Sequence, residues 1–380
     1  MHGDINILSS AGLLIITAFG LVSLCARLGV PSISGYILTG LIIGPVGLDL
    51  ITESGILAEI GEIGIVLLLF TLGLEFSLNK LITLKRLIFG VGAAQVVLTT
   101  AIVATAVSSL MEVPVVASVV IGGAVAMSST ALCIKVLSKE GSLGSAPGRI
   151  TIAILLFQDL AAIGFLLILD AASADHDSTG FINFLVGVGV LIVLLIGARI
   201  VLQRIANWIE RHGDPELAQL LALAVALGAA VTATTFGVSP SLSAFAAGMI
   251  ISEGDTRNVV EREIRPFRDI LVGIFFISIG TQFPASTPFS VWPDVLLWLT
   301  VLFVGKGLLI AAILRLFGED KQVALQTSMI LAHGGEFSLV LISVALTLGA
   351  VEPHLGNPLL LALGIGMLIA SFIVKKASSG

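Results

Sequence analysis

A carboxylate lies near the middle of a long apolar segment. Residues 150–170 read ITIAILLFQDLAAIGFLLILD, and a run of about 20 such residues can cross a bilayer. Asp159 lies ten residues after Arg149, about 15 Å into a hydrocarbon core that is about 30 Å thick. A charge at that depth is costly and usually marks an ion or proton pathway. We therefore predict an ion site at Asp159 and its neighbour Gln158. The alternative is a protonated Asp159 that only stabilises a helix bundle.

A second charge is predicted at a similar depth in another apolar segment. Lys306 lies nine residues before Arg315, about 13 Å from the end of its segment. A lysine stem is too short to bring the ammonium group to the membrane surface over that distance. We expect Lys306 to fix the central helices and to offset the dipoles of helix ends. A purely structural ion pair is the alternative.

The composition defines the class of protein. The chain has 380 residues, 57% of them hydrophobic and 12% charged, and its mean hydropathy is +1.11. A soluble domain could not bury so much apolar surface, and the long, unalternating apolar runs exclude a transmembrane β-barrel. The sequence predicts an all-α polytopic membrane protein that contacts the lipid bilayer and no nucleic acid. Cys25 and Cys133 lie in apolar segments and are interpreted as packing residues.

Thirteen membrane spans account for the distribution of the basic residues. With that number, 18 of the 19 Lys and Arg residues, all except Lys306, fall on one side of the membrane. The positive-inside rule then places the N-terminus outside and the C-terminus in the cytoplasm. We expect a multi-pass protein of the inner or plasma membrane. The predicted spans are 6–26, 32–44, 55–74, 87–110, 113–137, 150–171, 181–203, 216–236, 240–252, 266–282, 290–314, 322–348 and 355–374.

The chain contains an internal repeat. Residues 35–44 align with 243–252 at an offset of 208. Residues 64–76 align with 272–283 at an offset of 207, which places Gly73 over Gly280 and Phe76 over Phe283. This offset pairs the second predicted span with the ninth. Because the two are separated by an odd number of spans, the repeats must have inverted topology, which is typical of secondary transporters.

The repeat also relates two polar interruptions of apolar segments. Ser128, Ser129 and Thr130 interrupt the fifth span, and the offset leads from them to Gly334 and Gly335 in the twelfth. In transporters with inverted repeats, discontinuous helices meet near the midplane and their free backbone groups hold ions. We predict two crossed discontinuous helices. The alternatives are hydroxyls bonded back to their own helix and glycines that only allow close packing.

Two titratable residues flank the second interruption. His333 and Glu336 are three residues apart and share a face of a helix. They could neutralise the ends of half-helices or form a pH-sensing pair. We expect both, together with Gly334 and Gly335, to support the central helices.

These motifs resemble the Kef-type branch of the monovalent cation:proton antiporters, and the resemblance covers essentially the whole chain. Electrogenic sodium/proton relatives carry two adjacent acids where this chain has Gln158 and Asp159. The resemblance therefore implies K⁺ as the cation and an electroneutral exchange for protons. The residues that carry it are FQDL at 157–160, SST at 128–130, Lys306, GGEF at 334–337 and PFRDILVGIFFISIG at 266–280.

The resemblance also implies a sodium/proton-antiporter-like fold and a homodimer. Each protomer would have a scaffold for dimerisation and a mobile core. Kef-type proteins usually continue into a cytoplasmic nucleotide-binding domain, but only ASSG follows Lys376 here, so the chain is either truncated or a short relative. We expect no nucleotide-binding domain in this chain, and a cytoplasmic regulatory domain would be a missing partner. The scaffold is assigned to 6–74 and 216–282, the core to 87–171 and 290–374, and the linker helix to 181–203.

These predictions combine into one mechanism. Asp159 would bind either a proton or a dehydrated K⁺, so that only a neutralised site crosses the membrane. Ser128, Ser129, Thr130 and backbone carbonyls would replace the water of the cation. Gln158 would orient Asp159 or ligate the cation through its amide oxygen. No catalytic residue and no cofactor is expected beyond the transported K⁺ and H⁺.

Four other classes remain open. A Na⁺/H⁺ antiporter would use the same fold. A ligand-gated potassium efflux channel would need a continuous filter, and no TVGYG-like run is present. The titratable Asp159 argues against an organic-anion symporter. A membrane enzyme is the weakest alternative, because no metal cluster or nucleophile triad stands out.

Overall fold

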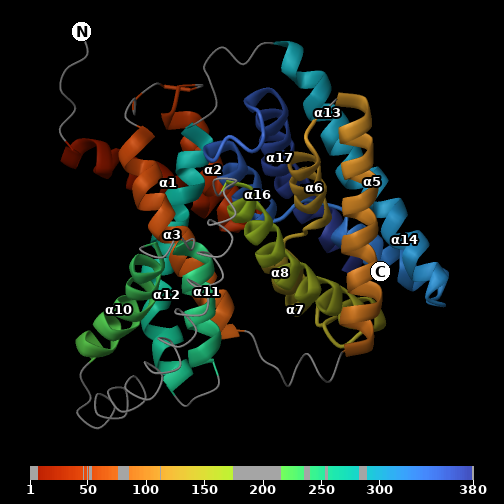
Figure 1. Cartoon of the computed structure of the whole chain (residues 1–380), viewed down its shortest axis with the longest axis horizontal. Coiled ribbons are helices and arrows are strands. Elements are labelled where there is room, and N and C mark those ends of the chain that lie inside the picture. Colours follow the sequence, from red (N-terminus) through yellow and green to blue (C-terminus); the bar gives the residue numbers. More distant parts are fainter. Residues whose placement is uncertain are drawn as a thin grey trace. The chain divides into compact units, whose positions relative to one another are not determined.

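The computed structural model consists of helices and their connections throughout the part of the chain that it describes (Figure 1). The structure describes residues 7–45, 47–48, 50, 54–75, 85–111, 113–173, 215–234, 240–252, 256–281 and 289–378. The predicted seventh span, 181–203, lies outside these residues. The α-helices are α1 (Ile7–Leu28), α2 (Ser32–Ile43), α3 (Ser54–Glu75), α5 (Ala93–Met111), α6 (Val115–Ala126), α7 (Thr130–Lys139), α8 (Ala146–Ser173), α10 (Pro215–Thr234), α11 (Pro240–Ile251), α12 (Thr256–Thr281), α13 (Trp292–Thr300), α14 (Lys306–Leu316), α15 (Lys321–Leu331), α16 (Glu336–Thr347) and α17 (Pro353–Ser378).

Three shorter elements complete the described helical segments. A π-helical segment, η1 (Leu87–Gly92), leads into α5, and a second one, η3 (Val301–Gly305), joins α13 to α14. A 3₁₀ turn, η2 (Phe289–Val291), precedes α13. The segment η3 ends directly before Lys306, so a local change in helix geometry precedes the buried lysine. Such π-helical segments are frequent at functional sites.

The described helices are long and apolar enough for a multi-pass membrane protein. Six helical stretches in the described residues could cross a membrane, and a seventh is added if the bent pair α15 and α16 is one span. Helix α2 and residues 219–232 of α10 form shorter apolar helices. The full count of thirteen spans stays a prediction. The six stretches are Ala11–Leu28, Leu87–Met111, Val115–Lys139, Ala146–Leu169, Trp292–Leu316 and Pro353–Ser378.

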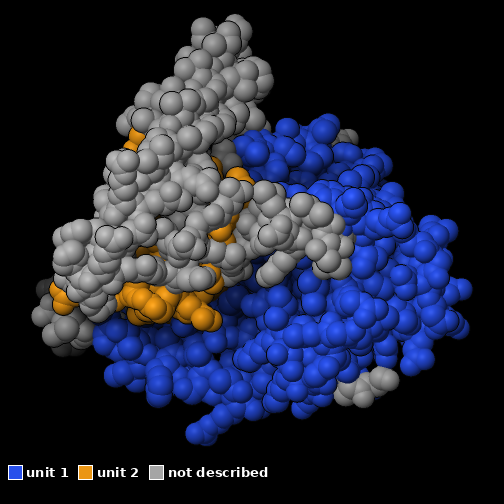
Figure 2. Space-filling view, turned by 90° about the horizontal axis from the view of Figure 1, so that it is seen from below, with its two compact units in different colours: residues 1–52, 83–169, 279–380 blue, residues 53–82, 170–278 orange. Residues whose placement is uncertain are grey.

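The chain divides into two compact units, coloured separately in Figure 2. Unit 1 contains Met1–Thr52, Thr83–Leu169 and Ile279–Gly380, and unit 2 contains Glu53–Ile82 and Asp170–Ser278. Unit 1 therefore holds α1 and α2 together with the helices that were assigned to the core. Compactness does not say which helices move together, so the division into scaffold and mobile core stays a prediction.

The order of the helices repeats within the chain. Helices α2 and α11 both have twelve residues, and α11 begins 208 residues after α2. The discontinuous pair of α6 and α7 recurs 206 residues later as α15 and α16. The long helix α8 recurs 207 residues later as α17. These offsets agree with the repeat in the sequence.

Two glycine contacts follow the same repeat. A Cβ atom on Gly280 would lie 2.8 Å from the Cα of Gly40 in unit 1, and one on Gly248 would lie 3.0 Å from the Cα of Gly73 in unit 2. Gly248 lies 208 residues after Gly40, and Gly280 lies 207 residues after Gly73. Each unit therefore contains one copy of the same close helix contact, with a glycine on each of the two helices.

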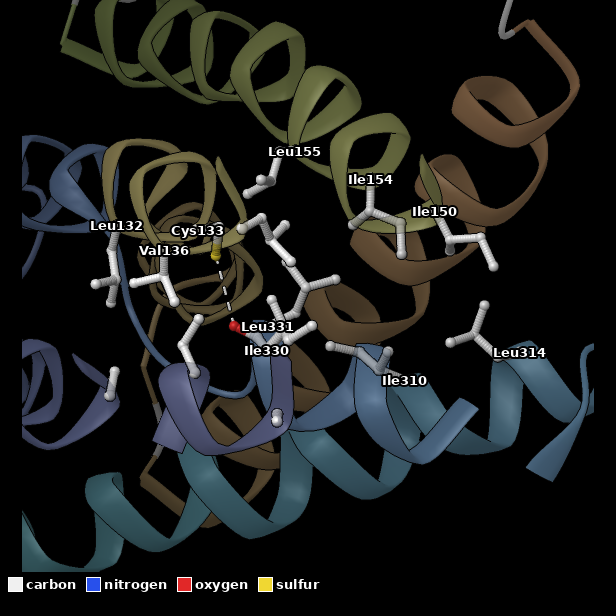
Figure 3. Close-up of a cluster of buried hydrophobic side chains, with 14 of the residues drawn as sticks. Leu132, Cys133, Val136, Ile150, Ile154, Leu155, Ile310, Leu314, Ile330 and Leu331 are labelled. Carbon is white, nitrogen blue, oxygen red and sulfur yellow. Dashed lines mark hydrogen bonds between the residues drawn. The ribbon is translucent and has the colours of Figure 1, made fainter. Parts of the chain in front are cut away.

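An apolar cluster in unit 1 packs the helices around the predicted site. Figure 3 shows side chains from α7, α8, α14 and α15 in this cluster, among them Leu132, Ile154 and Leu331. The thiol of Cys133 donates to the backbone oxygen of Ile330, with 3.5 Å between sulfur and oxygen. Cys133 is buried and free, as expected of a packing residue.

Candidate ion site at two helix breaks

The structure has a helix break at each of the two predicted interruptions. Helix α6 ends at Ala126 and α7 begins at Thr130, and the backbone is extended at Met127 and Ser129. Helix α15 ends at Leu331 and α16 begins at Glu336, with a bend of 45° between the two helices. Backbone groups at these ends have no partner within their own helix and need others.

The two breaks contact each other directly. The hydroxyl of Ser128 donates to the backbone oxygen of Leu331 at 2.8 Å, and the backbone N–H of Ser129 donates to Nε2 of His333 at 3.3 Å. A Cβ atom on Gly335 would lie 2.5 Å from the carbonyl carbon of Ser128. Glycine is therefore needed at position 335 because the two backbones meet there.

Lys306 joins the carboxyl-terminal ends of both interrupted helices. Its ammonium group donates to the backbone oxygens of Met127 at 2.6 Å and His333 at 2.8 Å, and to the hydroxyl of Ser128 at 2.9 Å. These bonds use all three of its protons. The side chain is only 2% exposed, so it does not reach the membrane surface. A positive charge at helix carboxyl termini would offset the helix dipoles, and this role stays a prediction for Lys306.

Glu336 lies at the amino-terminal ends of the two following helices. It is the first residue of α16, and its Oε1 accepts from the backbone N–H of Ala131 in the first turn of α7 at 3.3 Å. A carboxylate is favourable at helix amino termini. A basic residue, Lys306, and an acidic residue, Glu336, thus lie at opposite ends of the breaks.

His333 is held as a neutral acceptor. The backbone N–H of Ser129 can donate to Nε2 only if that nitrogen carries no proton. The ring is fully buried and its backbone oxygen already accepts from Lys306. The structural role and the pH-sensing role of His333 both stay predictions.

Asp159 lies beside the start of α7. Its Oδ1 accepts from the hydroxyl of Thr130 at 3.1 Å. Both residues are partly exposed, whereas Gln158, Ser128 and Ser129 are buried. Among the five residues predicted to bind the ion or proton, Asp159 and Thr130 therefore form the accessible part.

Gln158 connects α8 to the first break. Its Oε1 accepts from the backbone N–H of Ser128 at 2.7 Å. Its Nε2 donates to Oε1 of Gln95 at 2.8 Å and lies 3.5 Å from the hydroxyl of Ser128. The amide oxygen that was predicted to orient Asp159 or ligate the cation is thus bonded to the backbone of the break.

Sequence reasoning overlooked Gln95. This residue of α5 is fully buried, and its Nε2 donates to the backbone oxygen of Ala126 at 3.1 Å and to the hydroxyl of Thr99 at 3.2 Å. A signal was available, since Gln95 is the only amide in the apolar segment 87–110. A polar side chain of that size inside a membrane span needs partners.

Comparisons with known proteins agree with these features. The family model "Sodium/hydrogen exchanger, transmembrane" matches residues 13–376. Two proteins of Arabidopsis thaliana, K(+) efflux antiporter 1, chloroplastic, and K(+) efflux antiporter 2, chloroplastic, are 35% and 34% identical over 350 residues. The alignments cover 89% of this chain but only 29% and 30% of those proteins, so the chain spans under a third of their length.

A solved structure shares the fold. The sodium proton antiporter MjNhaP1 from Methanocaldococcus jannaschii at pH 8 aligns with a TM-score of 0.64 and 18% identity, over 98% of this chain and 94% of that one. A second structure of the same antiporter aligns with a TM-score of 0.62. At this identity the likeness concerns the fold alone. The family match shows that the chain belongs to the sodium/hydrogen exchanger family, and the K⁺ efflux antiporters among its relatives support its place in the Kef-type branch of cation:proton antiporters.

Proposed function

We propose that the chain exchanges K⁺ for H⁺ across the membrane, with Asp159 as the site of both ions. The observation that carries the proposal is the pairing of Asp159 with Thr130 at a helix break. The carboxylate and the hydroxyl are partly exposed, whereas the other polar residues of the break are buried and hydrogen-bonded. Oxygen ligands at a partly accessible break suit a monovalent cation that has lost water.

Competition at one carboxylate would couple the two ions. Asp159 holds either a proton or a K⁺, and the occupied site is neutral in both cases. A neutral site crosses a low-dielectric core at lower cost than a charged one. Because the neighbouring Gln158 carries no charge, one proton would exchange for one cation, and transport would be electroneutral.

Exchange would proceed by alternating access. The predicted core would move against the scaffold and carry the two crossed, discontinuous helices with it. Thirteen spans in two inverted repeats, an outer N-terminus and a cytoplasmic C-terminus are part of the proposal, as is placement in an inner or plasma membrane. We also propose a homodimer and control by a cytoplasmic domain outside this sequence.

The identity of the cation has a second candidate. The names of the relatives at 35% and 34% identity refer to K⁺. The name of the antiporter that shares the fold, and the description of the family, refer to sodium. We favour K⁺ because the relatives that are more similar in sequence support it, and Na⁺/H⁺ exchange is the alternative.

Purified protein in liposomes with an internal pH dye tests the proposal. A proton gradient is imposed across the liposome membrane, and K⁺, Na⁺, Li⁺ or choline is then added outside. The wild type and Asp159→Asn are measured in parallel. We expect proton movement with K⁺ that is insensitive to membrane voltage. In Asp159→Asn it falls to the rate of protein-free liposomes, because the amide cannot exchange a proton for a cation. The apparent KM for K⁺ rises as the pH falls, since protons compete for Asp159.

The outcomes separate the alternatives. A response to Na⁺ and not to K⁺ would keep the antiporter and change the cation. A current that persists without a proton gradient would indicate a channel. Normal exchange by Asp159→Asn would remove Asp159 from the mechanism.

A further inference from the structure

Gln95 is a buried amide in α5 whose position the exchange reaction alone does not explain. We propose that Gln95 is a positioning residue for the ion site and acts through Gln158. The two side chains form an amide clamp, a term used here for Gln95 and Gln158, which closes on the break between α6 and α7. The proposal rests on the proposed function, because the site that it positions is Asp159.

The clamp begins and ends at the same break. Gln95 donates to the backbone oxygen of Ala126, the last residue of α6. Gln158 accepts from the backbone N–H of Ser128, two residues further along the chain. Between them, Nε2 of Gln158 donates to Oε1 of Gln95 at 2.8 Å. Three hydrogen bonds therefore connect the carbonyl of Ala126 to the N–H of Ser128 through side chains of α5 and α8.

The two backbone groups fix the direction of both amides. The carbonyl of Ala126 can only accept, so Gln95 must turn its NH₂ group towards it and its oxygen towards Gln158. Gln158 must then present its NH₂ group to Gln95 and its oxygen to the N–H of Ser128. If either amide rotated by half a turn, two donors or two acceptors would face each other inside the protein, at the cost of an unsatisfied buried group.

This polarity explains why position 158 holds an amide. An ionised carboxylate at 158 would accept from Ser128 but would place its second oxygen against the oxygen of Gln95. If Gln95 rotated to relieve that contact, the carbonyl of Ala126 would lose its donor. Gln95 thus favours an uncharged side chain at 158 and leaves Asp159 as the exchangeable charge beside it.

The clamp also sets the position of Asp159 along α8. Gln158 is bonded to Ser128, and the adjacent Asp159 is bonded to Thr130, two residues further along the break. These two bonds together fix the register of α8 against the start of α7. Without Gln95, Gln158 could rotate and the bond to Ser128 would be lost, so Asp159 would no longer be held at Thr130.

Gln95→Met tests this role, because methionine keeps the length of the side chain and removes the amide. We expect an apparent affinity for K⁺ about tenfold weaker than in the wild type, the effect of losing the one buried hydrogen bond between Gln158 and Ser128, with a smaller change in maximal rate. Thr100→Val is the matched control. It lies on the same helix, and its hydroxyl is buried with no hydrogen-bond partner among the described residues, so exchange by Thr100→Val should equal that of the wild type.

A double-mutant cycle tests whether Gln95 acts through Gln158. Thermal unfolding in detergent and exchange in liposomes are measured for Gln95→Met, Gln158→Met and the double variant. Neighbours in one hydrogen-bond network are not additive. We expect Gln95→Met to have little further effect on exchange once Gln158 is replaced, and a smaller effect on unfolding than in the wild type, because Gln95 still donates to Ala126 in Gln158→Met.

The results distinguish this inference from the proposed function. If the wild type exchanges cations and Gln95→Met has unchanged affinity, the positioning role is wrong and the function stands. Additive effects in the cycle would also overturn the role, since the two residues would then act independently. If no cation produces exchange by the wild type, the proposed function fails, and the unfolding cycle still decides whether the clamp exists.

Discussion

At the scale of single residues, the candidate ion site is a set of backbone groups that side chains from other segments satisfy. The carbonyls of Ala126 and Met127 accept from Gln95 and Lys306, and the N–H groups of Ser128 and Ser129 donate to Gln158 and His333. Inside a membrane no water is present to bond such groups, so each one needs a protein partner. The break can persist because these partners come from α5, α8, α14 and the second break.

Lys306 should therefore contribute more to stability than an exposed lysine. Lys306→Met removes the donor from two backbone oxygens and one hydroxyl. We expect its free energy of unfolding to fall by about 1–3 kcal/mol, the cost of buried groups left without partners. Thermal unfolding in detergent measures the change.

Lys321→Met provides the matched control. Lys321 is exposed at the start of α15, and its replacement should leave stability unchanged. If Lys306→Met and Lys321→Met had the same free energy of unfolding, the hydrogen bonds of Lys306 would contribute nothing to stability.

At the scale of elements, the structure depends on how closely the two breaks approach. Gly335 lies against the backbone of Ser128, whereas the neighbouring Gly334 lies against the end of the Leu363 side chain. A side chain can turn away, but the backbone of the break is held by its hydrogen bonds. The two adjacent glycines should therefore differ in how well they tolerate an added side chain.

Gly335→Ala and Gly334→Ala compare these tolerances. The new Cβ atom of Gly335→Ala would lie 2.5 Å from the carbonyl of Ser128, so the breaks must separate. We expect a loss of about 1–3 kcal/mol in unfolding free energy, typical of overpacking, and slower cation exchange. Gly334→Ala should lose less, because Leu363 can move. If Gly335→Ala and Gly334→Ala had the same free energy of unfolding and exchanged cations at the wild-type rate, the contact between the breaks would not limit transport.

At the scale of the whole molecule, the internal repeat places the same helix contact in both compact units. Gly40 contacts Gly280 in unit 1, and Gly73 contacts Gly248 in unit 2. Each contact joins a helix of the first repeat to a helix of the second, so neither repeat forms a unit by itself. Gly64 adds to this pattern, since a Cβ atom there would lie 2.5 Å from the backbone oxygen of Leu271, its own counterpart at an offset of 207.

Equivalent substitutions in the two repeats should have similar effects. Gly73→Ala and Gly280→Ala each place a Cβ atom against the backbone of another helix. We expect each to lower the free energy of unfolding by about 1–3 kcal/mol. Thermal unfolding in detergent compares both with Gly228→Ala in α10, where no described atom outside the glycine's own stretch of helix lies within 4 Å of the new Cβ atom. Gly228→Ala should be neutral or stabilising by about 1 kcal/mol, because alanine favours a helix. If Gly73→Ala and Gly280→Ala lowered the free energy of unfolding by very different amounts, the two contacts would not be equivalent.

The sequence by itself determined the class of protein, the repeat and the positions of both helix breaks. Composition and the length of apolar runs report the solvent that each segment meets, and a bilayer restricts the choice to helices. The polar run at 128–130 and the glycines at 334 and 335 were visible because they interrupt apolar segments. Counting residues along a helix also gave the predicted depth of Asp159 and Lys306 in the membrane.

Only the tertiary structure decided which groups these residues contact. Lys306 was recognised as a buried charge, but its bonds to Met127, Ser128 and His333 depend on how α14 packs against both breaks. Gln95 was missed for the same reason, because an amide becomes part of a site only through partners on α6 and α8. Hydrogen bonds depend on direction over about 3 Å, and no pattern along one helix records the direction of groups on another.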